Sequence, residues 1–238
     1  MSQTTSIDIL AFGAHPDDVE LSISGTLIKH RNQGHSIGIV DLTRGELGTR
    51  GHADLRDQEA ESASKALGLS IRRNLRLADG FFDRTEENLR QIIGVIREFR
   101  PKVVLYPAPY DRHPDHARAS SMIKEACFYA GLPKIETTGL QAWRPHAFYA
   151  YVQDRFIKPT FVVDISGLWE EKIRVIQCYK SQFFDAESKE PITPISGPDF
   201  LAFLEARALQ MGREAGFMMG EGFISERVVG VDSLFQLK

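Results

Sequence analysis

This chain has little cysteine and no long hydrophobic run. Its 238 residues include two cysteines, Cys127 and Cys178, and their spacing supports neither a disulfide framework nor cysteine ligation of a metal. No apolar run approaches the roughly 18 residues that span a membrane. Residues 1–6 also lack the basic region and apolar stretch of a signal peptide. We therefore expect a cytoplasmic protein with no membrane partner.

The chain also lacks a strong charge bias and a phosphate-binding loop. Its formal net charge is −3, which is not typical of a nucleic-acid-binding surface. The first apolar run leads into a segment from Gly13 to Asp18 that has no GxGxxG pattern and carries acidic side chains where a pyrophosphate would lie. A nucleotide-binding module is therefore disfavoured, and we expect no nucleic-acid partner.

The first half of the chain alternates strand-like apolar runs with helix-like amphipathic segments. The expected strands are Ile7–Ala14, Ser36–Leu42, Arg73–Leu77 and Val103–Tyr106, and the expected helices are Val19–Arg31, Leu55–Leu67, Glu86–Phe99 and Pro114–Tyr129. This alternation predicts an α/β fold with a doubly wound, mostly parallel sheet and helices on both faces.

The second half has a weaker pattern. The expected strands are Ala147–Val152, Thr160–Asp164 and Val228–Leu234, and the expected helices are Leu168–Tyr179 and Asp199–Phe217. We interpret residues 1–140 as the core and residues 141–238 as a smaller C-terminal lobe packed on it, within one domain.

Two short polar segments follow the first and fourth expected strands. They are Ala14-His15-Pro16-Asp17-Asp18-Val19-Glu20 and His113-Pro114-Asp115-His116. In the common doubly wound order these two strands are neighbours at the point where the strand order reverses, and ligands bind at that point. If this order holds, the two segments form one site.

The residue types in these segments suit a catalytic metal. His15 and Asp18 are three residues apart, and if Pro16 opens a helix their side chains converge across its first turn. His116 would then supply a third ligand from the other segment. Two histidines and a carboxylate leave metal positions open for water and substrate, as in catalytic zinc sites. The same ligand types also suit Fe(II), so the metal stays open between the two.

The neighbouring residues suit acid–base catalysis beside the metal. Asp17 points away from Asp18 and is a candidate base for a metal-bound water, although an aspartate at this place is often only a helix cap. His113, if protonated, would stabilise a tetrahedral oxyanion. Asp115 is a candidate to orient His113 and favour its charged form. These residues together predict a metal-dependent hydrolase.

The two motifs resemble those of the LmbE-like, or PIG-L, family of zinc-dependent N-acetylglucosamine deacetylases. The resemblance extends over most of the chain and is strongest toward the deacetylases of bacillithiol biosynthesis. Further matching segments are Thr43–Glu46, Arg56–Glu59, Asp111–His116, Tyr179–Phe183 and Glu221–Phe223.

The resemblance implies a Rossmann-like fold and a complete set of roles. The implied zinc ligands are His15, Asp18 and His116, the implied general base is Asp17, and the implied electrophilic residue is His113, supported by Asp115. The implied reaction is hydrolysis of the acetamide of N-acetylglucosaminyl malate to glucosaminyl malate and acetate. Members of this subfamily are often hexameric, so a homo-oligomer is expected.

The residues that bind the rest of the substrate are less sharply defined. The resemblance suggests Arg56, which otherwise would pair with Glu59 on a solvated helix face. Arg112 lies near the predicted mouth and suits a malate carboxylate. Glu46 would bind sugar hydroxyls or only cap a turn.

Other functions remain open at this point. The same chemistry would serve a chitooligosaccharide, a mycothiol precursor, an inositol-linked glucosamine or the amide of a thiol conjugate. A non-catalytic sugar-binding protein is disfavoured because the full set of ligands and a base is present.

Overall fold

The computed structural model describes residues 6–137 and 139–236, and its centre is one sheet of seven strands. The strands are β1 (Ile9–Gly13), β2 (Ile37–Asp41), β3 (Ile71–Asn74), β4 (Val103–Tyr106), β5 (Ala147–Tyr151), β6 (Phe161–Asp164) and β7 (Gly220–Ile224). Their order is β3-β2-β1-β4-β5-β7-β6. The first five pair in parallel, and β7 runs antiparallel to both β5 and β6. The predicted α/β fold and the assumed pairing of β1 with β4 are confirmed.

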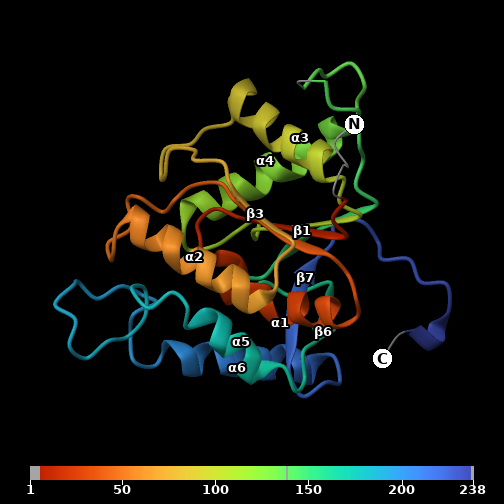
Figure 1. Cartoon of the computed structure of the whole chain (residues 1–238). Coiled ribbons are helices and arrows are strands. Elements are labelled where there is room, and N and C mark those ends of the chain that lie inside the picture. Colours follow the sequence, from red (N-terminus) through yellow and green to blue (C-terminus); the bar gives the residue numbers. More distant parts are fainter. Residues whose placement is uncertain (1–5, 138, 237–238) are drawn as a thin grey trace.

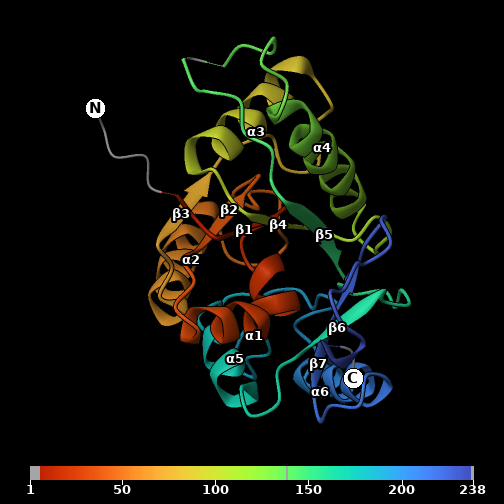
Figure 2. The ribbon, with the colours of Figure 1, turned by 90° about the vertical axis from the view of Figure 1, so that its right-hand side faces the viewer.

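Helices cover both faces of the sheet (Figure 1). They are α1 (Asp18–Asn32), α2 (Ala53–Leu67), α3 (Glu86–Phe99), α4 (Pro114–Ala130), α5 (Trp169–Ile176) and α6 (Phe200–Glu214), followed by a short 3₁₀ helix, Leu234–Gln236. One face carries α3 and α4, and the other carries α1, α2 and α5 (Figures 1 and 2). The remaining helix, α6, packs against β6 and β7.

Strand β1 is buried on both faces and divides the hydrophobic core in two. Its residues Leu10 and Phe12 pack in the cluster under α3 and α4, while Ile9 and Ala11 pack in the cluster under α1, α2 and α5. Alternate side chains of a strand point to opposite faces, so a strand covered on both faces reads as a continuous apolar run. This is why the sequence pattern identified β1 clearly.

Two expected strands were misplaced. The third lies at Ile71–Asn74 instead of Arg73–Leu77, and the last lies at Gly220–Ile224 instead of Val228–Leu234. Val228 is 98% exposed, so its apolar neighbourhood is not a buried strand. The true strand is rich in glycine because its neighbours lie very close. A Cβ on Gly220 would lie 2.3 Å from Val162 Cγ1, and one on Gly222 would lie 2.8 Å from Met211 Sδ.

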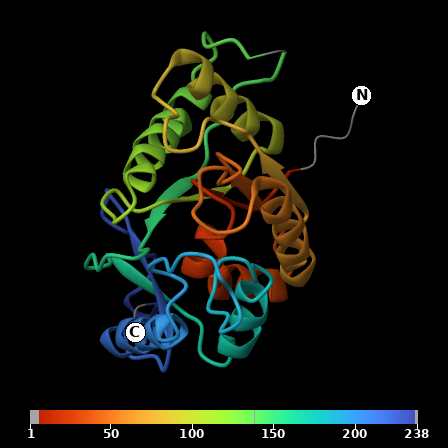
Figure 3. The ribbon, with the colours of Figure 1, turned by 90° about the vertical axis from the view of Figure 1, so that its left-hand side faces the viewer.

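The second half of the chain adds β5, β6 and β7 to the same sheet. The chain between α5 and α6 (light blue in Figure 3) lies against the loop after β2, where the side-chain amide of Gln182 donates to the Arg50 carbonyl at 3.0 Å. The division into a core and a lobe at residue 140 stays a prediction. Cys127 and Cys178 are both free, and Cys178 lies in the turn after α5, not within a helix.

The sequence predicts neither a signal peptide nor a membrane-spanning segment. Residues 1–5, for which no signal peptide was expected, lie outside the described residues. Among the helices described, none has the length and apolar character to cross a bilayer.

Asp8 ties together the chain segments that lead into three neighbouring strands. Its carboxylate accepts hydrogen bonds from the Ser36 N–H at 2.9 Å and hydroxyl at 3.0 Å, and it pairs with Lys102 Nζ at 2.7 Å. The hydrogen bond from Lys102, followed by that from the Ser36 N–H, lowers the pKa of Asp8 to about 2. A lowered pKa means that the folded state favours the ionised carboxylate, so Asp8 stabilises the fold above its ordinary pKa of 3.8 and loses this effect as the pH falls toward 2.

We predict that Asp8→Asn lowers the free energy of unfolding by about 1 kcal/mol at pH 7, since Lys102 is largely exposed and the pair is screened by solvent. The loss should shrink as the pH falls from 4 to about 2. Urea unfolding across this range checks it, with Asp83→Asn as the exposed control. A loss that is the same at pH 7 and at pH 3 would contradict the role given to the Asp8 charge.

Candidate metal centre and active site

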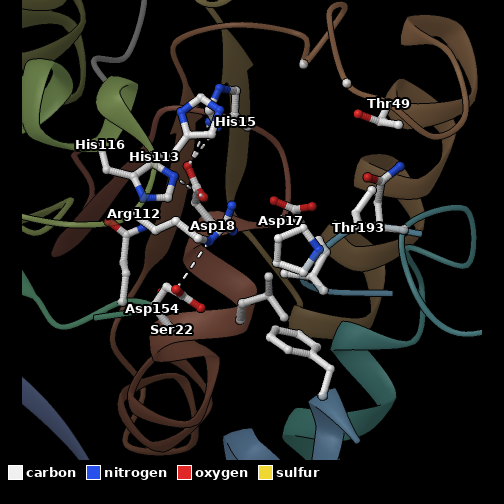
Figure 4. Close-up of a pocket in the computed structure, with 18 of the residues that line it drawn as sticks. His15, Asp17, Asp18, Ser22, Thr49, Arg112, His113, His116, Asp154 and Thr193 are labelled. Atoms are coloured by element: carbon white, nitrogen blue, oxygen red, sulfur yellow. Dashed lines mark hydrogen bonds and ion pairs between the residues drawn. The ribbon is translucent and has the colours of Figure 1, made fainter. Parts of the chain in front are cut away.

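The pairing of β1 with β4 brings the two polar segments together. The first segment follows β1 directly, and the second follows the loop after β4. The ring centroids of His15 and His113 are 4.7 Å apart, and those of His113 and His116 are 5.3 Å apart. Figure 4 shows these three rings gathered around Asp18 in one pocket. The structure therefore joins the motifs that the sequence predicted to meet.

Asp18 lies between two imidazoles. Its Oδ2 atom is 3.5 Å from His15 Nδ1, and its Oδ1 atom is 3.0 Å from His116 Nε2. All three side chains are at most about a tenth exposed. Asp18 therefore lies within reach of one nitrogen of each ring, and two imidazole nitrogens with a carboxylate are the donor types expected for a catalytic divalent metal.

Each of these imidazoles uses its other nitrogen to contact a carboxylate. His116 Nδ1 lies 2.5 Å from Asp111 Oδ2, and His15 Nε2 lies 3.0 Å from Asp79 Oδ1 and 3.3 Å from Asp115 Oδ2. A metal-binding histidine commonly donates its second ring N–H to such a group, which sets the ring's orientation and tautomer. The ring nitrogens that face Asp18 are therefore Nδ1 of His15 and Nε2 of His116.

The carboxylates also raise the pKa of both imidazoles. Burial alone would lower the pKa of His116, but the charge of Asp18 and the hydrogen bonds to Asp111 and Asp18 raise it to about 9. Burial likewise opposes the charged form of His15, yet hydrogen bonds to Asp115, Asp18 and Asp79 raise its pKa well above the ordinary value. The site thus attracts positive charge.

Two other groupings of possible ligands occur at the same place. Nitrogens of His15, His113 and His116 lie within 4.8 Å of one another, as do ligand atoms of His15, Asp79 and Asp115. In the second grouping, the carboxylates of Asp79 and Asp115 also accept hydrogen bonds from other groups. Asp79 accepts from Leu47 N at 2.8 Å, while Asp115 accepts from Gly80 N at 2.9 Å and from Arg118 at 2.6 Å. These carboxylates are better placed to orient His15 than to bind a metal.

The imidazole ring of His113 contacts a main-chain N–H group instead of a carboxylate. As the residue before α4, it accepts the Asp115 N–H at its Nδ1 atom, at 3.3 Å. In the neutral ring the proton then lies on Nε2. Burial, together with His15 and His116, lowers the pKa of His113. The Asp115 carboxylate faces His15 instead of His113, so the expected orientation of His113 by this side chain is corrected; its main-chain N–H is what His113 contacts.

Asp17 has an unusual backbone conformation. Its φ of 109° lies in a region that side chains other than glycine rarely adopt, and such strain is often found at functional sites. It precedes α1 but its side chain caps no helix N–H, which argues against the simple capping interpretation. Burial, partly offset by Arg56, raises its pKa to about 7. Figure 4 shows Asp17 across the pocket from His113 and His116.

The three expected substrate-binding residues have different surroundings. Arg56 is buried and donates to the Pro16 carbonyl at 2.8 Å and to Asp17 at 3.3 Å, so it supports Asp17 and does not pair with Glu59. Glu46 accepts from the main-chain N–H groups of Arg44 and Asp79, which matches the alternative in which it holds a turn. Arg112 lies at the pocket wall, 3.2 Å from Asp154 (Figure 4).

The pocket has a volume of about 360 Å³ and includes residues that sequence reasoning missed. Asp79 follows β3 and so lies at the same edge of the sheet as the two motifs, which was a usable signal. Arg207 lines the pocket from α6. It stands about 90 residues beyond the second motif, and no local pattern marked it.

Comparisons with known proteins show the family of this chain. The PIG-L family model, described as GlcNAc-PI de-N-acetylase, matches residues 10–127. Diacetylchitobiose deacetylase from Thermococcus kodakarensis is 32% identical over 225 residues, which cover 90% of this chain and 81% of that protein. The chain belongs to the PIG-L, or LmbE-like, deacetylase family. It is accordingly a hydrolytic N-deacetylase.

Two further proteins are similar to most of this chain. A probable N-acetyl-alpha-D-glucosaminyl L-malate deacetylase 2 from Bacillus anthracis is 27% identical over 194 residues, covering 74% of this chain and 81% of that protein. Among solved structures, the conserved protein TT1542 from Thermus thermophilus superposes with a TM-score of 0.86 at 33% identity, covering 96% of this chain and 98% of that one.

We predict that Asp111→Asn weakens zinc binding by about 10- to 100-fold because the amide no longer accepts the His116 Nδ1–H as a charged partner. A competition titration with a chromogenic chelator measures the dissociation constant, and Asp185→Asn on the exposed surface is the control. Unchanged affinity in the Asp111 variant would contradict the role of Asp111 in orienting His116 for metal binding.

Proposed function

We propose that the protein is a zinc-dependent deacetylase that hydrolyses the acetamide of N-acetylglucosaminyl malate. The observation that supports the chemistry is the position of Asp18 between His15 and His116, next in the chain to the strained Asp17. Fe(II) remains the alternative metal, because the same donors bind it. The cytoplasmic location and a homo-oligomeric, hexameric assembly expected from the sequence stay predictions.

The residues fit a divalent metal held by His15 Nδ1, Asp18 and His116 Nε2. When bound there, such an ion supplies Lewis acidity toward the amide carbonyl and lowers the pKa of a water ligand toward about 7. Asp79, Asp111 and Asp115 hold the two imidazoles in orientation from outside the metal set.

Asp17 is the proposed general base. Its carboxylate accepts a proton from the attacking water, and the water oxygen forms a bond to the acetamide carbon. The pKa of about 7 suits this task, since a base works best near the pH at which it operates. Arg56, 3.3 Å away, holds the carboxylate in place. When the carbon–nitrogen bond breaks, Asp17 returns the proton to the leaving amine, and acetate departs.

His113 is the proposed oxyanion donor. Because its Nδ1 atom accepts the Asp115 N–H, its Nε2–H is available to donate to the carbonyl oxygen as negative charge develops there. The contact of its Nδ1 atom with the Asp115 N–H and its lowered pKa both favour a neutral ring in this role, in place of the protonated ring expected from the sequence.

Two guanidinium groups support an anionic aglycone. Arg112 pairs with the Asp154 carboxylate, and Arg207 donates to the Asp154 main-chain carbonyl, so two cations stand beside one carboxylate in the pocket wall. The formal charges of the two guanidinium groups and the Asp154 carboxylate sum to +1. A malate carboxylate would complete the balance, and planar guanidinium groups match carboxylate geometry. A chitooligosaccharide, the rival substrate suggested by the Thermococcus relative, is neutral at this end.

We predict that Asp17→Ala lowers kcat for N-acetylglucosaminyl malate by about 100-fold or more while zinc stays bound. Amine release and metal content of the same sample measure the two properties, and Asp185→Asn serves as the surface control. Near-normal turnover in the Asp17 variant would exclude it as the base.

We predict that Arg207→Met raises KM for N-acetylglucosaminyl malate about tenfold and leaves diacetylchitobiose deacetylation unchanged, because only the first substrate carries carboxylates. Arg213→Met, on the exposed surface of the same helix, is the matched control. Equal effects on both substrates would contradict the anionic subsite, and efficient turnover of diacetylchitobiose alone would favour the rival function.

A further inference from the structure

Helix α1 is broken in its middle. Ile23 has φ −137° and ψ 17°, outside the helical region, so residues 18–22 and 24–32 form two helical pieces. The first piece is a single turn that begins with Asp18, and its last residue, Ser22, also lines the pocket. A break of this kind leaves a carbonyl and N–H groups without helical partners, and burial of these groups requires other partners.

A buried ion pair supplies those partners. Lys172 of α5 donates to the Ser22 carbonyl at 3.2 Å, at the end of the first piece. Glu221 of β7 accepts from the N–H groups of Gly25 at 3.0 Å and Thr26 at 2.6 Å, at the start of the second piece. The two side chains pair at 2.6 Å and are only 4% and 3% exposed. The pair therefore contacts both sides of the break.

The surroundings of the ion pair are closely packed. A Cβ on Gly25 would lie 2.8 Å from Glu221 Oε1 and 2.9 Å from Ile165 Cγ2, so only glycine fits there without displacement. Ser24 also donates its hydroxyl to the Glu20 carbonyl at 2.6 Å, which satisfies another group of the first piece. Burial of two charges is costly, so a buried pair of this kind is weak evidence of net stabilisation by itself.

We propose that Lys172 and Glu221 are positioning residues for the metal centre. A single helical turn has little stability of its own, so the place of residues 18–22 depends on what holds its ends. At its start, the Asp18 carboxylate accepts the His15 N–H at 2.9 Å; at its other end, Lys172 holds Ser22. The pair thus fixes where Asp18 stands relative to His15 and His116. This inference rests on the proposed metal set of His15, Asp18 and His116.

The decisive variant is Lys172→Met/Glu221→Leu, which replaces the pair by apolar side chains of similar size. The variant buries no unpaired charge, but the Ser22 carbonyl and the Gly25 and Thr26 N–H groups lose these partners, so the thermal midpoint should fall. The zinc affinity of the folded protein is therefore the readout that separates the two roles. We expect its zinc dissociation constant, measured by chelator competition, to rise about tenfold, because the first turn of α1 loses its anchor. A purely structural role would leave zinc affinity unchanged.

Arg97→Met is the matched control. Arg97 is also a buried cation that donates to main-chain carbonyls, those of Ala130, Leu132 and Ile135, but it lies on the face covered by α3 and α4. Its loss should lower the thermal midpoint and leave zinc affinity unchanged. Gly25→Ala provides a second test, since its new methyl group displaces Glu221 without removing either charge, and it should also weaken zinc binding.

The outcomes separate the two proposals. Weak or absent zinc binding by the parent protein would overturn the proposed metal set. Parent-like zinc affinity in the folded double variant and in Gly25→Ala would overturn the positioning role while leaving the metal set intact.

Discussion

The site depends on the parallel pairing of β1 with β4. The register aligns Ile9 with Val103 and Ala11 with Leu105, so both strands deliver their carboxyl ends to the same edge of the sheet. The segments that leave this edge, including the first turns of α1 and α4, carry His15, Asp18 and His116, although His15 and His116 are about 100 residues apart in the chain. A strand order that separated β1 from β4 would place the two motifs apart, and neither motif alone would supply the complete set of proposed ligands.

The second constraint is the balance of charge around that edge. Five buried aspartates, at positions 17, 18, 79, 111 and 115, surround two imidazoles. Arg56 offsets Asp17, and Arg118 offsets Asp115. The Asp18 carboxylate contacts the two imidazole rings and the His15 N–H, and no lysine or arginine of the described residues pairs with it. A divalent cation between His15, Asp18 and His116 is the natural partner for this arrangement. In this proposal, the carboxylates of Asp79, Asp111 and Asp115 orient the two imidazoles. The pair of Lys172 and Glu221 holds the first turn of α1, which carries Asp18.

Local patterns predicted the first half of the fold and the centre of the site. The apolar run of β1 and the Pro114 signal lie in short stretches that can be recognised by themselves. Pro16 does not open a helix as expected, because α1 begins at Asp18 after the cap residue Asp17. The last strand was missed because close packing against Val162 and Met211 requires glycines, which resemble a turn. Asp115 was expected to orient His113, but its partner His15 comes from a distant loop. Arg207 and Glu221 act through similarly distant contacts, which leave no periodic signal.

The most direct test of the account is a crystal structure of the zinc-loaded protein with anomalous diffraction data at the zinc edge. The account predicts one peak bound by His15 Nδ1, the Asp18 carboxylate and His116 Nε2 at about 2.0–2.2 Å, with His113 outside the coordination sphere. A peak bound by His15, His113 and His116 without Asp18, or one held by Asp79 and Asp115, would contradict it.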